Sequence, residues 1–191
     1  MGAITIKDNE AFLRMRSNEV SLTDRDLYDN IECVKKHLKA VSNCLALSAV
    51  QVGVLKRIVV IKTDNANGIP REEKDWLILL NPEIISMNGR TEFWEACESC
   101  LLNFGLVERP YKMTIRYQTI NGETEAQHFE GFICTVLAHE MDHLEGILHM
   151  DRAKELYQMD LAERREFRKS HPYKIYSKNC LFKYEEISKT Y

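Results

Sequence analysis

Residues 139–143 read His-Glu-Met-Asp-His, which is the spacing H-E-x-x-H, inside a run that is typical of a helix. Residues four apart lie on the same face of a helix, so His139 and His143 can bind one metal ion together. Glu140 then lies beside a water molecule on that metal and can accept its proton. This arrangement is suited to metal-assisted hydrolysis of an amide or an ester.

The surroundings of these residues favour such a site. Residues 131–145 are apolar around most of the helix, which predicts that the helix is buried in a core. Polar groups without partners are costly in a core, so the two histidines need partners there. Hydrogen bonds to the backbone would satisfy the histidines but would leave Glu140 without a role. A bound metal accounts for all three residues.

The third protein ligand decides the class of the site, because catalytic zinc-type centres use three protein ligands and one water. One candidate is His149, since residues 139–149 match H-E-x-x-H-x-x-G-x-x-H, the signature of metzincin proteases. Metzincins also carry a methionine-containing turn well downstream, and Met150 and Met159 lie too close to His149 to form it. The other candidate is Cys100, which follows a strand-like run.

Three segments, in this order, resemble the three motifs of the peptide deformylase family. Residues 44–51 read CLALSAVQ, where the family has G-φ-G-φ-A-A-x-Q with φ apolar. Residues 98–102 read ESCLL, where the family has E-G-C-φ-S. Residues 138–146 read AHEMDHLEG, where the family has Q-H-E-φ-D-H-φ-x-G. The resemblance extends over residues 5–170 and favours a cysteine as the third ligand.

The resemblance implies a metal-dependent hydrolase that removes the formyl group from formyl-methionine of nascent polypeptides and releases formate. The implied metal ligands are Cys100, His139 and His143. The implied general base is Glu140, and the implied oxyanion donors are the Gln51 side-chain amide and the Leu101 backbone N–H. The family implies Fe(II) in the cell, whereas the Cys-His-His donor set equally allows zinc and also admits nickel or cobalt.

The ligand face of the predicted helix also predicts a substrate pocket. Val136, Thr135 and Phe132 precede His139 by three, four and seven residues, so they share its face. A mostly apolar pocket suits the unbranched thioether of methionine, and the resemblance implies that the family's methionine pocket lies here. The resemblance adds two residues beside the substrate backbone, Leu45 and Ala46.

The sequence departs from the family motifs at several positions. Cys44 and Ala46 replace the two glycines of the first motif, where the lack of a side chain permits close approach of a substrate. The loop after Cys100 is short and lacks a counterpart of the family's substrate-contacting arginine. These departures leave open a deformylase-like protein of weak or altered activity that binds peptide N-termini. A metzincin-like metalloprotease that uses His149 is the other alternative.

A chain of 191 residues can bury one sizeable core, which predicts a single catalytic domain over residues 1–170 and a C-terminal tail over residues 171–191. The net charge of −3 provides no general attraction to DNA or to a membrane. No apolar run reaches the roughly 20 residues that span a bilayer. The six cysteines are expected to be reduced thiols, which predicts a cytoplasmic protein.

The pattern of elements predicts an α+β fold, in which short antiparallel strands surround the metal-binding helix and further helices lie near both ends. Helices are expected over residues 23–41 and, on the surface, over residues 151–170. The expected strands are residues 57–62, 76–80, 91–96, 113–120 and 123–129, and residues 64–73 are expected to form a polar loop. The tail combines lysines with aromatic residues, so it either contacts the ribosome transiently or packs on its own domain.

Overall fold

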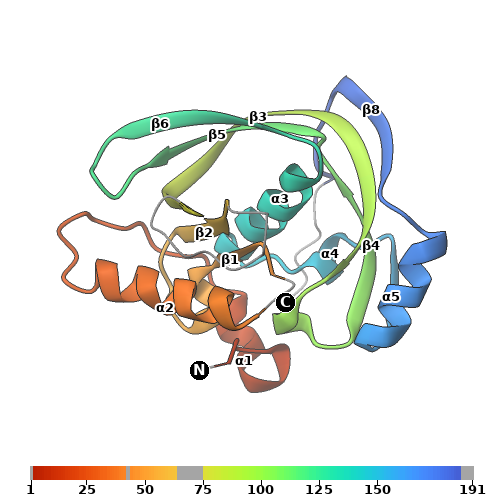
Figure 1. Cartoon of the computed structure of the whole chain (residues 1–191), viewed down its shortest axis with the longest axis horizontal. Helices are drawn as coiled ribbons and strands as arrows, with labels where there is room; N and C mark the ends of the chain where they lie inside the picture. Colours follow the sequence, from red (N-terminus) through yellow and green to blue (C-terminus); the bar gives the residue numbers. More distant parts are fainter. Residues whose placement is uncertain (1, 42–43, 64–74, 186–191) are drawn as a thin grey trace.

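The chain folds around one long strand and one buried helix, as the computed structural model in Figure 1 shows. The structure describes residues 2–41, 44–63 and 75–185, so the polar loop expected at 64–73 lies outside the described residues. The helices are α1 (Ile6–Leu13), α2 (Leu27–Ala40), α3 (Phe132–Leu144), α4 (His149–Arg152) and α5 (Leu161–Ser170). The strands are β1 (Ala46–Ser48), β2 (Ile58–Lys62), β3 (Trp76–Ala96), β4 (Asn103–Arg109), β5 (Lys112–Gln118), β6 (Thr124–Glu130), β7 (Glu155–Gln158) and β8 (Lys174–Leu181). Two short 3-10 helices, η1 (Ala49–Val52) and η3 (Glu98–Cys100), follow β1 and β3.

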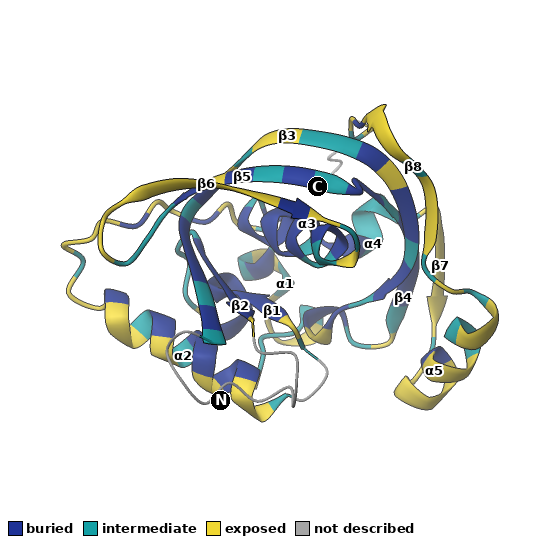
Figure 2. Ribbon diagram, turned by 45° about the horizontal axis from the view of Figure 1, so that its top comes forward, coloured by how far each residue is buried: buried dark blue, intermediate teal, exposed yellow. Residues whose placement is uncertain are grey.

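All of these strands belong to one sheet, and each of their pairings is antiparallel. β3 is the central strand, because it pairs along its length with β2, β5, β8 and β4. The sheet therefore curves around α3 rather than lying flat (Figures 1 and 2). The α+β class and the central helix predicted from the sequence are confirmed.

β3 joins two strands that the sequence predicted as separate elements, residues 76–80 and 91–96. Asn81-Pro82 indicated an end because proline lacks the N–H that a strand ladder needs. In the structure Asn81 takes a positive φ of 49°, and the register between β3 and β5 shifts at this point. A bulge of this kind accommodates the proline, so the chain stays in the sheet and reaches across the core.

α3 is the buried helix that the sequence predicted over residues 131–145, and its bounds differ by one residue at each end. Gly131 precedes it with a positive φ of 85°, a conformation that glycine adopts without a steric penalty. The apolar face of α3 packs on β2, β3, β5 and β6, and Figure 2 shows the helix enclosed by the sheet. Its buried apolar side chains are Cys134, Leu137, Ala138, Met141 and Leu144. Burial of each large apolar side chain contributes roughly 1.5–3 kcal/mol to the free energy of folding. These contributions fix the orientation of α3 about its own axis.

α2 begins at Leu27 instead of the predicted residue 23. Asp24, expected near the helix start, forms a turn instead: its carboxylate accepts hydrogen bonds from the Ser21 N–H (3.2 Å) and from Lys56 Nζ (2.8 Å). The apolar positions expected on the inner face of this helix are all buried. They are Leu27, Ile31, Val34 and Leu38.

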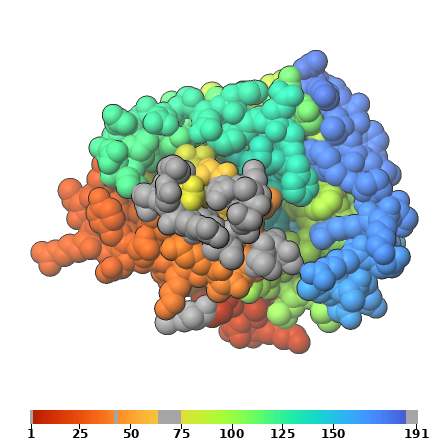
Figure 3. Space-filling view, viewed as in Figure 1, coloured from red at the N-terminus to blue at the C-terminus, as the bar shows by residue number. Residues whose placement is uncertain are grey.

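The surface helix predicted over residues 151–170 is correct only in its second half. β7 occupies part of the first half, because β4 offers it an edge with which to pair. Asp160 then caps α5 by accepting hydrogen bonds from the N–H groups of Ala162 and Glu163. β8 pairs with β3, so the C-terminal segment lies along the flank of the molecule (Figure 3). Within the described part of the chain, no helix is long and apolar enough to cross a membrane.

Gly146, just after α3, offers a test of how tightly this helix end is packed. Its φ is +70°, and an added Cβ would overlap the Arg14 backbone. We expect Gly146→Ala to lower the free energy of unfolding by more than about 1 kcal/mol, because neither the conformation nor the space admits a side chain. Urea unfolding followed by circular dichroism measures the change.

Gly131→Ala is the matched control for this experiment. Its φ is +85°, but no atom lies within 4 Å of the added Cβ, so it carries the conformational penalty without the overlap. Equal losses in the two variants would show that contact with Arg14 has no effect on stability.

Candidate functional site

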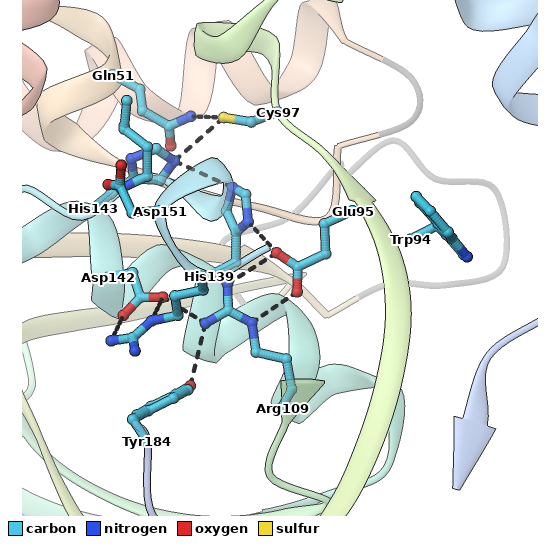
Figure 4. Close-up of polar contacts among 12 residues, drawn as sticks. Gln51, Trp94, Glu95, Cys97, Arg109, His139, Asp142, His143, Asp151 and Tyr184 are labelled. Carbon is cyan, nitrogen blue, oxygen red and sulfur yellow. Dashed lines mark hydrogen bonds and ion pairs between the residues drawn. The ribbon is translucent and has the colours of Figure 1, made fainter. Parts of the chain in front are cut away.

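Three metal-ligand side chains meet at the buried end of β3. Cys97, His139 and His143 each offer one ligand atom, and these atoms lie within 4.8 Å of one another. Nε2 of His143 lies 3.2 Å from Nε2 of His139 and 3.3 Å from Cys97 Sγ (Figure 4). Two imidazoles and a thiolate around one tetrahedral ion would be spaced by about 3.3–3.6 Å, given metal–ligand bonds of roughly 2.0–2.3 Å. The spacing therefore fits one metal ion bound by Cys97, His139 and His143.

The electrostatics of the group also fit a bound cation. Burial alone would lower the pKa of His139, but Cys97 and Glu95 outweigh burial and raise that pKa well above its ordinary value. Glu95 Oε2 accepts a hydrogen bond from His139 Nδ1 at 2.9 Å, which turns Nε2 toward the other two ligand atoms. A carboxylate behind a histidine ligand in this way sets both its tautomer and its ring orientation.

Cys97, and not Cys100, is the cysteine that the structure brings to the two histidines. Extended backbone carries Cys97 past the end of β3, and the chain then turns away in η3. Cys100 is fully buried beside Leu13 and Leu148, and its sulfur is not among the three ligand atoms that lie together. The predicted ligand Cys100 is therefore corrected to Cys97.

This correction moves the second motif back by three residues. Residues 95–99 read Glu-Ala-Cys-Glu-Ser and retain the glutamate, the cysteine and the serine of E-G-C-φ-S. The segment after Cys97 is three residues longer than the segment after Cys100. At the new position Glu95 is the glutamate of the motif, and it is the residue that hydrogen-bonds to His139.

Leu101, the predicted backbone donor to an oxyanion, is corrected for the same reason. Its N–H donates to the Glu98 carbonyl oxygen at 3.3 Å, and Leu101 does not line the cavity described below. The N–H that follows the metal cysteine belongs to Glu98. Glu98 is the first residue of η3, where a helix provides no acceptor for the N–H group.

The predicted base and the predicted side-chain donor share one anchor, Ser48. The Ser48 N–H donates to Glu140 Oε2 at 2.8 Å, and the Ser48 hydroxyl donates to Gln51 Oε1 at 3.0 Å. Gln51 Nε2 is thereby turned toward Cys97 Sγ, at 3.4 Å. Burial raises the pKa of Glu140 to about 7, so its carboxyl group can both accept and release a proton near neutral pH.

Behind the ligands lies a set of buried charges that the sequence analysis did not identify. Arg109 is fully buried and donates to both carboxylate oxygens of Glu95, at 2.7 and 2.9 Å. Its third contact is Asp142, which also accepts two hydrogen bonds from Arg152, at 2.6 and 2.7 Å. The signal in the sequence was the aspartate of the third motif, since a buried aspartate needs a cationic partner.

A cavity of about 310 Å³ opens beside the ligands. It contains all five predicted substrate-contacting residues in its wall: Leu45, Ala46, Phe132, Thr135 and Val136. Gln51, Cys97, Glu98, His139 and Glu140 line the same cavity. Three residues of α5, Leu161, Arg164 and Arg168, complete one side, and no local pattern in the sequence indicated that this helix reaches the cavity.

His149, the alternative third ligand, lies outside the group of ligand atoms. Its ring stacks on the His139 ring with 5.8 Å between centroids, and both of its nitrogens are buried without a partner among the described residues. Burial lowers the pKa of His149 to about 4, which keeps the ring neutral. The geometry thus supports a cysteine, and not a third histidine, at this centre.

Comparisons with known proteins point to one family. The family described as polypeptide deformylase matches residues 3–159 of the chain. Peptide deformylase 2 of Clostridium acetobutylicum is 34% identical over 152 residues, which cover 80% of this chain and 95% of that protein. The peptide deformylase of Leptospira biflexa is 33% identical over 156 residues, covering 78% of this chain and 86% of the relative.

Solved structures agree with the sequence relatives. The peptide deformylase of Plasmodium falciparum superposes with a TM-score of 0.68 at 29% identity, covering 88% of this chain and 90% of that one. A Met-Ala-Ser-bound class I type b peptide deformylase from Acinetobacter baumannii gives 0.67 at 26% identity, with coverages of 80% and 97%. The chain therefore belongs to the peptide deformylase family, whose members are hydrolases that remove the N-terminal formyl group from peptides.

Proposed function

We propose that the chain deformylates formyl-methionine at the N-terminus of nascent polypeptides, with one divalent metal held by Cys97, His139 and His143. The observation that carries this proposal is the meeting of these three ligand atoms beside Glu140 at the wall of one cavity. Fe(II) is the proposed metal in the cell, and the thiolate-imidazole donor set also admits zinc, nickel or cobalt. When bound, the metal supplies a Lewis acid that lowers the pKa of a water molecule.

The protein's own groups then move one proton and stabilise one developing charge. Glu140 accepts the proton of the attacking water and passes it to the leaving amine as formate departs. Its raised pKa suits both transfers. Gln51 Nε2 and the Glu98 N–H are the proposed donors to the oxyanion, with Glu98 replacing Leu101 in this role. Ser48 donates a hydrogen bond to each of Glu140 and Gln51 and so fixes the position of one side chain relative to the other.

The cavity beside the ligands is the proposed methionine pocket. Phe132, Thr135 and Val136 lie on the ligand face of α3, and Leu45 and Ala46 line the same cavity. An unbranched thioether can adapt to such a wall, because its three torsions rotate freely.

The proposed place of action is the cytoplasm. All six cysteines are free thiols, as a reducing compartment requires. Transient contact between the C-terminal tail and the ribosome stays a prediction. Part of this tail pairs with β3 as β8 and so packs on its own domain.

Substitution of the two nearby cysteines tests the metal ligands. We expect Cys97→Ser to lose most of the bound metal, because a neutral hydroxyl is a poor replacement for a thiolate. Cys100→Ser should keep about one metal ion per folded chain, although it buries a hydroxyl at a cost of roughly 1–3 kcal/mol. Elemental analysis of anaerobically purified, Fe(II)-loaded proteins measures the metal. The reverse pattern would return the ligand role to Cys100, and loss of metal in His149→Ala would support the metzincin alternative.

Glu140→Gln tests the base. Formate release from formyl-Met-Ala-Ser should fall by about 10²–10⁴-fold, because the variant cannot accept the proton of water. Metal content should stay near that of the unmodified chain, since Glu140 is not a ligand. Met-Ala-Ser, the product of this reaction, is the peptide bound in the Acinetobacter baumannii structure. A fully metallated Glu140→Gln variant that releases formate at the normal rate would exclude this role.

Val136→Phe tests the pocket. The larger ring should fill the cavity and reduce kcat/KM for formyl-Met-Ala-Ser by about 10–200-fold, with a smaller effect on formyl-Gly-Ala-Ser. Ile133→Phe is the matched control, because Ile133 is also half-buried on α3 but does not line this cavity. Equal losses for both peptides in Val136→Phe would mean that the first side chain binds elsewhere.

A further inference from the structure

A series of hydrogen-bonded, charged side chains leads away from the metal site toward α4. It starts at His139, whose Nδ1 donates to Glu95, and continues through Arg109 to Asp142 and Arg152. Figure 4 shows how Arg109 faces Glu95 on one side and Asp142 on the other. The charges of its two carboxylates and its two guanidinium groups balance one another.

The geometry of this network matters for the metal site because its members are buried. Arg109 is 0% exposed, Glu95 is 4% exposed and Asp142 is 6% exposed. Water entering at Asp142 would compete for Arg109, and a displaced Arg109 would release Glu95. Glu95 is the residue that holds His139 by its Nδ1, so a disturbance at one end of the network reaches a metal ligand at the other.

Tyr184 closes the far end of this network. Its hydroxyl oxygen accepts a hydrogen bond from Arg109 Nη1 at 3.2 Å. The Arg152 guanidinium lies 3.7 Å from the centre of the Tyr184 ring, within reach of a cation–π interaction. Burial raises the pKa of Tyr184 to about 12, which keeps its hydroxyl group neutral near physiological pH. One side chain thus contacts both arginines of the network.

The segment that carries Tyr184 is anchored independently of the network. Asn88 and Leu181 are register partners between β3 and β8, and the Phe182 N–H donates to the Met87 carbonyl oxygen at 3.4 Å. Phe182 is 5% exposed and packs edge-to-face on Tyr184 with 5.0 Å between centroids. Leu181, Phe182 and Tyr184 lie beyond residue 159, so they are outside the part of the chain that matches the family.

We propose that Tyr184 is a positioning residue for the metal site, which closes the Arg109–Asp142–Arg152 network and so holds Glu95 against His139. This inference rests on the proposed metal site. Removal of the Tyr184 side chain loosens His139 and speeds loss of the metal. Changes to groups that hydrogen-bond directly to a metal ligand, as Glu95 does, typically alter metal affinity by about 10–100-fold. Tyr184 acts through Arg109 and Glu95, so this range is the upper limit of the expected effect.

The test uses the full chain loaded with Co(II), whose absorption spectrum reports the geometry of its ligands. We expect Tyr184→Ala to shift the cobalt bands and to transfer cobalt to a chelator faster than the unmodified chain, by a factor of up to about 10–100. Tyr184→Phe should give an intermediate rate, because it keeps the ring over Arg152 and loses only the acceptor for Arg109. Tyr176→Ala is the matched control: Tyr176 lies on β8 and bonds to Glu92, outside the network, and should leave spectrum and rate unchanged.

The outcomes distinguish a failure of the role of Tyr184 from a failure of the proposed metal site. A folded Tyr184→Ala variant with the normal spectrum and transfer rate would overturn the role of Tyr184 alone. If that variant does not fold, Tyr184→Phe decides in the same way. If Tyr184 only stabilises the fold, Tyr184→Ala and Tyr184→Phe will have lower unfolding temperatures but unchanged cobalt bands. That result would also overturn the proposal. Absence of a thiolate-to-cobalt band in the unmodified chain would overturn the metal site itself, and with it this inference.

Discussion

The charges buried where α3 meets β3 and β4 are the constraint on which the rest of the structure depends. Asp142 and Glu95 are almost fully buried, and each faces the fully buried Arg109. Breaking a buried pair of this kind typically costs about 3–5 kcal/mol, because the remaining charge stays in the core alone. The fold satisfies the constraint by bringing β3, β4 and α3 together at one point. Glu95, one partner in these ion pairs, also orients His139. The contacts that neutralise the buried charges therefore also position a residue of the candidate site.

β3 connects the buried charges at the site with the C-terminal segment. Near its end it provides Glu95, and the next extended residues deliver Cys97 to the two histidines. Further back along the strand, Met87 binds the backbone of Phe182 and so anchors the C-terminal segment. The bulge after residue 80 keeps this part of β3 continuous with residues 76–80, which pair with β2, because it bends the strand without ending the ladder. The proposed metal ligand Cys97, directly after β3, and the anchor of the C-terminal segment at Met87 are therefore both held by this strand.

Local spacing explains how much of this could be predicted from the sequence. His139, Glu140, His143 and the pocket face of α3 follow from helical periodicity, which a sequence displays directly. The cysteine did not follow, because Glu95-Ala96-Cys97 and Glu98-Ser99-Cys100 both read E-x-C after the same strand. In the sequence only the serine of the motif distinguishes them, because Ser99 stands two residues after Cys97 whereas Leu102 stands two residues after Cys100. In the structure the end of β3 and the turn of η3 distinguish them. The partners of Asp142 could not be predicted either, since Arg109 lies on another strand and no periodicity connects them.

The corrected position of the second motif also changes how the departures from the family are understood. Ser99 is retained, and its hydroxyl lies 3.4 Å from Gln51 Nε2, so this part of the site keeps its hydrogen-bonding group. Ala46 is 2% exposed and packs with the α3 cluster, which places its methyl group largely in the core. Cys44 donates to the Ala46 carbonyl oxygen, and burial raises the pKa of its thiol to about 12, so it does not offer a competing thiolate. The substitutions that suggested a protein able only to bind peptides therefore leave the proposed proton-transferring and oxyanion-binding groups in place, and the geometry favours an active hydrolase.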